Sequence, residues 1–330
     1  MPRASKPRKV GAAKSEVVAQ LPTACSDEAA AVEFMEQQRW GDSPACPHCG
    51  DMNVTRLRSK DGNRNNRFLW RCRGCSEQFT VRVGTVLEDS KIPLRHWCYA
   101  FWAACSSKKG VSALQIQRQT GLSYKSALFL MHRIRLAMTP DPATPPLLNG
   151  TVEADETYVG GRPRPKSPTA RVALHAKGHY RMPHPPSTKT PVMAVIERGG
   201  QARAMVVPAV TAKNERDVLY GTVARSARLM TDEGKHYRRV GRSFADHQTV
   251  KHSAYEYARG DVHVNGAENF FARLKRQLYG THHAVSKKHL HRYVAEVTFK
   301  HNTRELEDGA RVVSAIQGAE GKRLRYRGAY

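Results

Sequence analysis

Three acidic residues of this 330-residue chain occupy positions from which carboxylates could hold metal ions. Asp155 lies in the strand-like run 151–159, Asp232 follows the short apolar run 228–231, and Glu268 lies in the first turn of a predicted helix. Asp232 and Glu268 are separated by 35 residues. Carboxylates that converge from two strands and a helix can hold two hard cations such as Mg²⁺ (or Mn²⁺). Such ions activate a water or a 3′-OH and stabilise the leaving oxygen.

The residues around this triad leave alternatives open. The chain has 29 acidic residues, so three of them can resemble a metal site by chance. Glu268 could also serve only as a capping-box residue with Asn265 as the N-cap. Lys275 lies seven residues after Glu268 and therefore on the same helix face. The apolar side of this helix consists of Phe270, Phe271, Leu274 and Leu278. Other acids near the triad are Glu153, Glu156, Glu233 and Asp261.

A second set of candidate ligands is the pattern C-x2-C-x22-C-x2-C, formed by Cys46, Cys49, Cys72 and Cys75. Each Cys-x-x-Cys turn presents two thiolates to one ion, and four thiolates complete the tetrahedral shell of a structural Zn²⁺. The charged insert 58–67 accounts for the long spacing as a hairpin tip. A redox role for the pairs and His48 as a ligand are the weaker alternatives.

Residues 112–135 have the pattern of a helix-turn-helix. A first helix ends at Gly121, and Ser123 can N-cap the second. Its apolar face is Ala127, Leu130, Met131 and Ile134, and its outward side is Tyr124, Lys125, Ser126, His132 and Arg133. The start of such a helix meets base edges in the major groove. Any helical hairpin can show this pattern, but we expect Tyr124, Lys125, Ser126 and Arg133 to contact DNA.

The overall charge favours a nucleic-acid partner. The chain has 54 Lys and Arg against 29 Asp and Glu, a net charge of +25, and a polyanion neutralises such an excess by releasing counterions. No apolar run approaches the roughly 18–20 residues of a membrane span. The basic N-terminus lacks the apolar core of a secretory signal. Seven cysteines, an odd number, argue against a disulfide scaffold. We therefore expect a reduced, cytoplasmic, nucleoid-associated protein without a membrane partner.

Periodicity and composition divide the chain into segments. Within the last large segment, strands at 151–159, 192–196, 202–207 and 228–231 and helices at 214–227, 265–279 and 288–304 predict a mixed α/β domain. Alternation also predicts a strand at 79–83. The predicted order is a basic flexible arm (1–26), a helix plus zinc ribbon (27–92), a helix-turn-helix domain (93–138), a Pro-rich linker (139–150), the catalytic domain (151–310) with a basic Pro-rich insertion (161–191), and a basic C-terminal tail (311–330).

Several stretches resemble ISXO-type bacterial insertion-sequence transposases. They are 152–161 (VEADETYVGG), 231–234 (TDEG), 262–271 (VHVNGAENFF), 274–283 (LKRQLYGTHH), 288–293 (KHLHRY) and 299–304 (FKHNTR). Cys46-Pro-His-Cys49 after Arg39-Trp40 resembles the zinc ribbon of that family. The resemblance covers about residues 27–310.

The resemblance implies an RNase H-like sheet flanked by helices, with Asp155, Asp232 and Glu268 as its DDE triad. Lys275, beside Arg276, then matches the basic residue that touches DNA near the cleaved end. Some relatives carry Asn at the third position, and here Asn265 and Asn269 flank Glu268.

The expected activity is that of a DNA transposase. It would bind the ends of an insertion sequence in double-stranded DNA, cleave a phosphodiester and join the freed 3′-OH to target DNA. Pairing two ends requires at least a dimer. The alternatives are a non-catalytic DNA-binding regulator and an RNase H-like nuclease without strand transfer.

Overall fold

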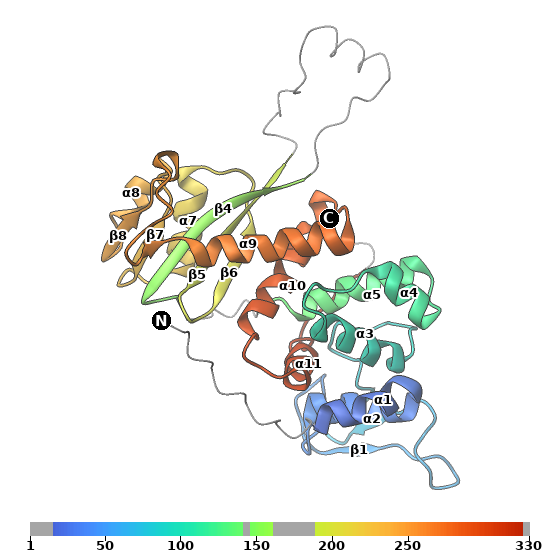
Figure 1. Ribbon diagram of the computed structural model, residues 1–330. Helices are drawn as coiled ribbons and strands as arrows, with labels where there is room; N and C mark the ends of the chain where they lie inside the picture. The colour runs from blue at the N-terminus through green and yellow to red at the C-terminus, as the bar shows by residue number, and fades with distance from the viewer. Residues whose placement is uncertain (1–15, 141–145, 161–188, 326–330) are drawn as a thin grey trace, which may run out of the picture. The chain divides into compact units, whose positions relative to one another are not determined.

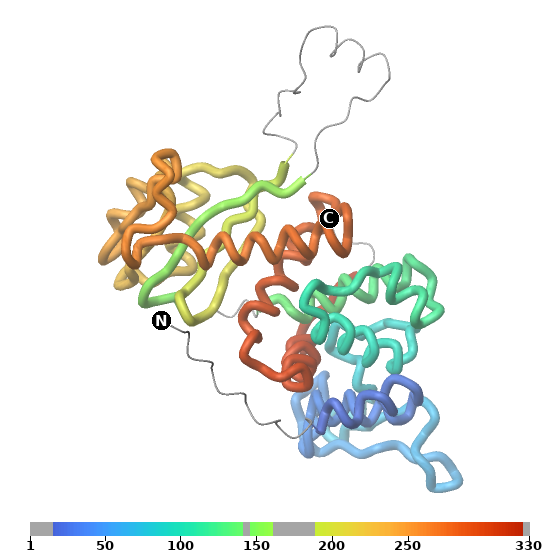
Figure 2. The backbone as a smooth tube through the Cα atoms, viewed as in Figure 1, coloured from blue at the N-terminus to red at the C-terminus, as the bar shows by residue number. Residues whose placement is uncertain are grey.

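The computed structural model describes residues 16–140, 146–160 and 189–325 (Figure 1). Two compact units divide the chain. One combines Met1–Thr139 with Thr303–Tyr330, and the other is Pro140–Asn302. The backbone trace in Figure 2 follows the chain out of the first unit and back into it near its end. The sheet-containing unit is therefore an insertion between two segments of the helical one.

Two helices open the first unit, α1 (Glu16–Ser26) and α2 (Glu28–Trp40). The side chain of Asp27 accepts a hydrogen bond from the Ala30 amide at 2.7 Å and so caps α2. The predicted flexible arm is wrong for residues 16–26, because Leu21 and Ala24 are buried and hold α1 in the core. Residues 1–15 lie outside the described residues.

The ribbon that follows is an antiparallel sheet of β1 (Val54–Arg56), β2 (Trp70–Cys72) and β3 (Gln78–Phe79). A bridge between Arg58 and Arg64 makes the charged insert a hairpin tip, as predicted. The predicted strand 79–83 is wrong beyond Phe79. The chain turns there, because Gly84 adopts a φ of 76° and the Arg82 guanidinium binds the carbonyls of Ser90 and Ile92.

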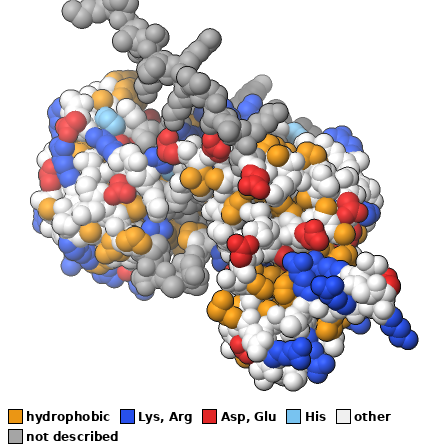
Figure 3. Space-filling view, turned by 90° about the horizontal axis from the view of Figure 1, so that it is seen from below, with side chains coloured by type: hydrophobic (Ala, Val, Ile, Leu, Met, Phe, Trp, Pro, Cys, Tyr) orange, Lys and Arg blue, Asp and Glu red, His pale blue; other side chains and the backbone are white. Residues whose placement is uncertain are grey.

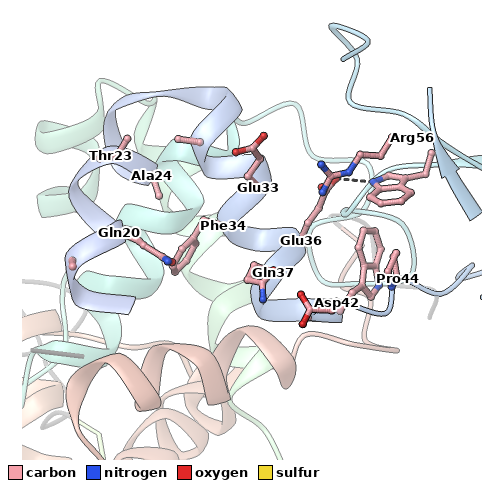
Figure 4. A pocket seen from close by; sticks show the side chains of 15 residues that line it. Gln20, Thr23, Ala24, Glu33, Phe34, Glu36, Gln37, Asp42, Pro44 and Arg56 are labelled. Carbon is pink, nitrogen blue, oxygen red and sulfur yellow. Dashed lines mark hydrogen bonds and ion pairs between the residues drawn. The ribbon is translucent and has the colours of Figure 1, made fainter. Parts of the chain in front are cut away.

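A buried acid joins α2 to this ribbon. Glu36 is 3% exposed, accepts a hydrogen bond from the Trp70 indole at 2.8 Å and pairs with Arg56 and Arg64. Glu36, Arg56 and Trp70 border a groove of about 880 Å³ along α1, α2 and the start of the ribbon (Figure 4). The groove contains none of the predicted site residues, so its volume alone marks no active site.

The next three helices are α3 (Leu94–Ser106), α4 (Ala113–Thr120) and α5 (Tyr124–Ala137). Gly121 ends α4 in the left-handed conformation, and the Ser123 side chain accepts a hydrogen bond from the Ser126 amide. The predicted turn, N-cap and apolar face are confirmed, since Ala127, Leu130, Met131 and Ile134 are all completely buried. Cys98 and Cys105 are buried in α3, where they pack as small apolar residues.

The outward placement of His132 and Arg133 is wrong. They are 5% and 7% exposed. Arg133 Nη1 donates to the carbonyls of Val86 at 3.0 Å and Glu88 at 2.8 Å, and its guanidinium lies over Phe129. The loop before α3 covers this side of α5, which periodicity within the helix cannot reveal. Arg133 therefore binds the protein's own backbone.

The predicted basic tail is also wrong in its first part. Residues 308–317 form α11 (Asp308–Gln317), which packs against α3 in the first unit and buries Val312, Ala315 and Ile316. Two hydrogen bonds, of 2.6 and 2.7 Å, join Glu320 to the guanidinium of Arg39. The catalytic domain was predicted to run to residue 310. The compact unit that contains the sheet ends at Asn302.

The second unit is built on a five-stranded mixed sheet in the order β6-β5-β4-β7-β8. Pairs β4–β5 and β5–β6 are antiparallel, whereas β4–β7 and β7–β8 are parallel. The predicted mixed α/β fold is confirmed. The strands are β4 (Thr151–Val159), β5 (Thr190–Glu197), β6 (Ala202–Val206), β7 (Arg228–Thr231) and β8 (Asp246–Thr249). A small pair, β9 (Ala258–Arg259) and β10 (Val262–His263), forms a separate two-stranded sheet that packs against β7 and β8.

Helices cover both faces of the sheet (Figure 1). One face packs on α7 (Ala212–Thr222) and α8 (Tyr237–Gly241), and the other on α9 (Asn265–Gln277) and α10 (Leu290–Asn302). Side chains alternate along a strand, so Val152 and Ala154 face α7 whereas Val159 faces α9. Short helical turns occur at His252–Ala254, Leu278–His282 and Lys287–His289.

Two Pro-rich segments were predicted next to the sheet, a linker at 139–150 and an insertion at 161–191. Leu148, placed in the linker, is 3% exposed and hydrogen-bonds through its backbone to Thr222 and Ala224, so the sheet unit begins before residue 151. Of the Pro-rich insertion, residues 161–188 lie outside the described residues. Along the parts of the chain that are described, no helix has both the length and the apolarity to cross a membrane.

The buried contacts of Arg133 predict a stability effect. Arg133→Met leaves the Val86 and Glu88 carbonyls without their donor, so we expect unfolding of the first unit to cost about 1–3 kcal/mol less. All four tryptophans lie between residues 40 and 102, so indole fluorescence during urea unfolding reports on this unit alone. Arg118→Met, at an exposed position of α4, is the control. Equal urea midpoints for both variants would show that the buried contacts contribute nothing.

Candidate active site

The two candidate aspartates lie on neighbouring parallel strands. Thr151, Val152 and Glu153 of β4 pair with Arg228, Leu229 and Met230 of β7, an offset of 77 residues. The same offset places Asp155 level with Asp232, directly after β7. There the backbone turns, and Asp232 Oδ1 accepts a hydrogen bond from the Gly234 amide at 2.9 Å. Alternation along β4 places Asp155 on the face of α9, and the charges of Asp232 and Glu268 both act on it.

The third candidate, Glu268, lies in the first turn of α9. Its side chain is 48% exposed, and its Oε1 lies 4.0 Å from Nε2 of His252. The apolar side of α9 is buried as predicted, with Phe270, Phe271 and Leu274 packed on the sheet. The helix thus directs Glu268 away from the core.

The carboxylates interact electrostatically. Burial and the nearby charges of Glu156, Asp232 and Glu268 raise the pKa of Asp155 to about 7, although the Glu156 amide donates to Asp155 Oδ1 at 2.8 Å and lowers it. A buried carboxylate among other carboxylates is costly when no cation is present. These residue types therefore fit hard divalent cations.

The triad does not form a closed set of ligands in this structure. In the described residues, the groups of possible ligand atoms that lie within 4.8 Å of one another are four cysteines and the set Glu156, Glu215 and His236. Asp155, Asp232 and Glu268 are near enough to influence one another's charge, but they are more widely spread. Sequence reasoning did not single out Glu215 or His236, because no short motif contains them.

A different acid holds the start of α9. Glu153 is 1% exposed, and its Oε2 accepts hydrogen bonds from the amides of Gly266 at 2.6 Å and Ala267 at 3.2 Å. Its Oε1 accepts from Arg198 Nε at 2.7 Å and lies 3.2 Å from His263 Nδ1. The predicted capping box is wrong, since Asn265 is already helical and the N-cap, Val264, has no side-chain cap. The helix is capped from strand β4 instead.

The other acids weighed as triad members have partners elsewhere. Glu233 accepts hydrogen bonds from the amide and hydroxyl of Ser253 at 2.9 and 2.7 Å. Asp261 pairs with Arg228. Glu156 faces α7 and α8, where its Oε2 accepts a 2.7 Å hydrogen bond from the Tyr237 hydroxyl.

Glu156 shares the face of α7 and α8 with Glu215. Burial raises the pKa of Glu156, although the Tyr237 hydrogen bond lowers it. Burial, followed by the charges of Glu156 and Asp232, raises the pKa of Glu215 to about 8. Ionisable carboxyl groups therefore gather on both faces of the sheet near the end of β4, and burial opposes their charged forms.

The four predicted zinc ligands come together in the ribbon. The Sγ atoms of Cys46 and Cys75 are 3.7 Å apart, and those of Cys49 and Cys72 are 3.6 Å apart. Tetrahedral Zn²⁺ with Zn–S bonds of 2.3 Å requires about 3.8 Å between sulfurs, so the cluster fits zinc. Burial would raise the pKa of the Cys46 thiol, but the amides of Cys49 and His48 and the neighbouring thiols lower it to about 7. His48 is exposed and is not part of the cluster.

The candidate DNA-contacting residues other than Arg133 are accessible. Tyr124 and Lys125 are exposed and Ser126 is half-buried at the start of α5. Lys275 and Arg276 are exposed on α9, where Arg276 Nε donates to the Ala272 carbonyl at 3.2 Å. Figure 3 shows Lys and Arg side chains gathered in clusters on the face drawn.

Comparisons with known proteins match both units. The model of the ISXO2-like transposase domain matches residues 147–302, and that of the transposase zinc-ribbon domain matches residues 26–78. An uncharacterized protein in transposable element ISH50 of Halobacterium salinarum is 30% identical over 274 residues, which is 81% of this chain and 88% of that protein. A chain of a simian T-cell lymphotropic virus intasome in complex with PP2A regulatory subunit B56 gamma is 14% identical, with a TM-score of 0.28. The match covers 56% of this chain and 63% of that one.

A zinc-ribbon domain followed by a transposase domain on a mixed α/β sheet defines the class of protein as a transposase. Within that class, the chain belongs to the ISXO2-like transposase family.

The cap on α9 predicts a local effect. Glu153→Gln removes the charge that faces two amides and a guanidinium, so we expect about 2–4 kcal/mol less stability in the first turn of α9. Hydrogen exchange of the Gly266 and Ala267 amides measures this directly. Asp217→Asn, a half-exposed carboxylate of the same unit, is the control. Unchanged protection of both amides in Glu153→Gln would refute the cap.

Proposed function

We propose that this transposase binds the ends of its insertion sequence, cleaves a phosphodiester bond there and joins the freed 3′-OH to target DNA. Asp155, Asp232 and Glu268 hold Mg²⁺ or Mn²⁺ for both steps. The observation that carries the proposal is the partly buried Asp155, whose charge is opposed by Asp232 and Glu268 from a neighbouring strand and a helix. The membership in a transposase family supports it.

Each residue of the triad has a separate task. Asp155 and Asp232, level with each other on β4 and after β7, form the fixed side of the site. Glu268 approaches from α9, whose position depends on the Glu153 cap. The bound ions supply an activated water or 3′-OH and stabilise the leaving oxygen. Lys275, two turns after Glu268 on the same face of α9, binds the phosphate backbone beside the cleaved bond together with Arg276.

The first unit supplies recognition of the element ends. We propose that Tyr124, Lys125 and Ser126, at the accessible start of α5, contact base edges and phosphates of double-stranded DNA. The four cysteines bind a structural Zn²⁺, because four thiolates at tetrahedral separation leave no position for a substrate. Joining two DNA ends to one target requires at least two copies of the chain.

Loss of a triad carboxylate should remove chemistry and spare binding. We expect Glu268→Gln and Asp232→Asn to lower strand transfer at least about 100-fold in Mg²⁺, with unchanged affinity for labelled element-end DNA in fluorescence anisotropy. Glu233→Gln, next to Asp232 but bonded to Ser253, should retain activity. Joined products from Glu268→Gln at the wild-type rate would move the third ligand elsewhere. Cleaved but unjoined ends from the wild type would indicate a nuclease without strand transfer.

Loss of one cysteine should unfold the ribbon. Cys72 is completely buried beside Trp70 and Phe79, so Cys72→Ser removes both a ligand and the packing that depends on it. We expect one zinc ion fewer per chain and a red-shifted tryptophan emission. Cys25→Ser, outside the cluster, should change neither. A full zinc content in Cys72→Ser would exclude the four-thiolate site.

A further inference from the structure

A second group of potential ligands lies on the face of β4 opposite to Asp155. Glu156 comes from β4, Glu215 from the first turn of α7, and His236 from the residue before α8. Their ligand atoms all lie within 4.8 Å of one another. His236 Nε2 is 3.1 Å from Glu215 Oε1 and 3.7 Å from Glu156 Oε1.

The group contains buried polar atoms without hydrogen bonds. Glu215 is 3% exposed, and neither of its carboxylate oxygens has a hydrogen-bond partner. His236 Nε2 is buried and also lacks one, despite its short distance to Glu215. A buried carboxylate without partners costs several kcal/mol in general, unless it is neutralised. The site therefore requires a counter-charge.

The backbone is shaped to bring His236 into this position. A side chain at Gly234 would place its Cβ 2.7 Å from His236 Nε2 and 2.9 Å from Asp232 Oδ1. Only glycine leaves room for both groups on this short turn. The same turn thus sets the position of Asp232 and of the imidazole.

The geometry suits one small transition-metal ion. Zinc binds imidazole nitrogen and carboxylate oxygen at about 2.0–2.2 Å, which places tetrahedral ligands about 3.4 Å apart. The separations of 3.1 and 3.7 Å lie on either side of this value. An imidazole favours Zn²⁺ over Mg²⁺, which prefers oxygen ligands and keeps its waters.

We propose that Glu156, Glu215 and His236 bind one Zn²⁺ ion, distinct from the ion of the four cysteines and from the ions of the triad. The ion joins β4, α7 and α8 and neutralises two carboxylates beside Asp155 and Asp232. The ion holds strand β4 and the turn at Gly234 in position, and does not contact DNA. The inference does not depend on strand transfer, because its evidence comes from different side chains.

Zinc content of the purified full chain tests the proposal. We expect two zinc ions per wild-type chain after dialysis against millimolar Mg²⁺, and one in Glu215→Gln and His236→Asn. Zinc affinity at this site should fall by more than the 10–100-fold that follows loss of an outer-shell partner. Asp217→Asn, on the same helix as Glu215 but half-exposed, should keep both ions. Added Zn²⁺ should raise the melting temperature of the sheet unit in metal-stripped wild type, and should leave that of the sheet unit in Glu215→Gln unchanged, although the ribbon of both chains binds zinc.

Several results would overturn the proposal. One zinc ion per wild-type chain, lost with Cys72→Ser, would leave a proton shared by Glu156, Glu215 and His236 as the counter-charge. A second zinc ion that persists in Glu215→Gln but disappears in Asp232→Asn would belong to the triad. If Glu215→Gln failed to fold, His236→Asn would decide by the same zinc count. Failure of strand transfer with two ions present would count against the proposed function alone.

Discussion

The buried carboxylate of Glu153 is the contact on which the candidate active site depends. It joins strand β4 to the first amides of α9, and through Arg198 it joins both to the turn between β5 and β6. Asp155 lies two residues further along the same strand, and Glu268 lies one residue beyond the second capped amide. One carboxylate thus fixes the relation between two candidate ligands that are 113 residues apart (268 − 155). A capping side chain from the residues next to α9 could fix where the helix begins. It could not fix the distance between α9 and strand β4.

Around this fixed point, carboxyl groups are concentrated in surroundings that oppose their ionisation. Alternation along β4 places Asp155 on one face of the sheet and Glu156 on the other, so adjacent residues extend the charge to both faces. Burial makes each carboxylate harder to ionise, and each ionised neighbour adds to the effect. The proposed cations would relieve this on both sides. Folding and metal binding would then be linked in the sheet unit as well as in the ribbon.

Patterns within one segment could be predicted from the sequence, whereas contacts between distant segments could not. The turn at Gly121, the cap at Ser123 and the cysteine cluster follow from residue types at fixed spacing. Arg133 looked external because the loop that covers α5 lies more than 40 residues earlier. Glu153 looked like a spare acid, since its partners are 113 and 114 residues away. Buried charges are the hardest residues to place, because composition alone marks them as surface.

The order of the two units along the chain bears on the proposed separation of DNA binding from chemistry. The chain leaves the helical unit at Thr139 and rejoins it at Thr303, so both ends of the sheet unit are anchored in one body. At the return, Arg311 binds the carbonyls of Thr303 and Cys105, while Asn302 exchanges hydrogen bonds with Ala202 of the sheet. The hydrogen bonds of Arg311 thus lie within the first unit, and those of Asn302 within the second. The carboxylates of β4 and α9 belong to the second unit, and none of the contacts described above for the helix-turn-helix and the ribbon involves them.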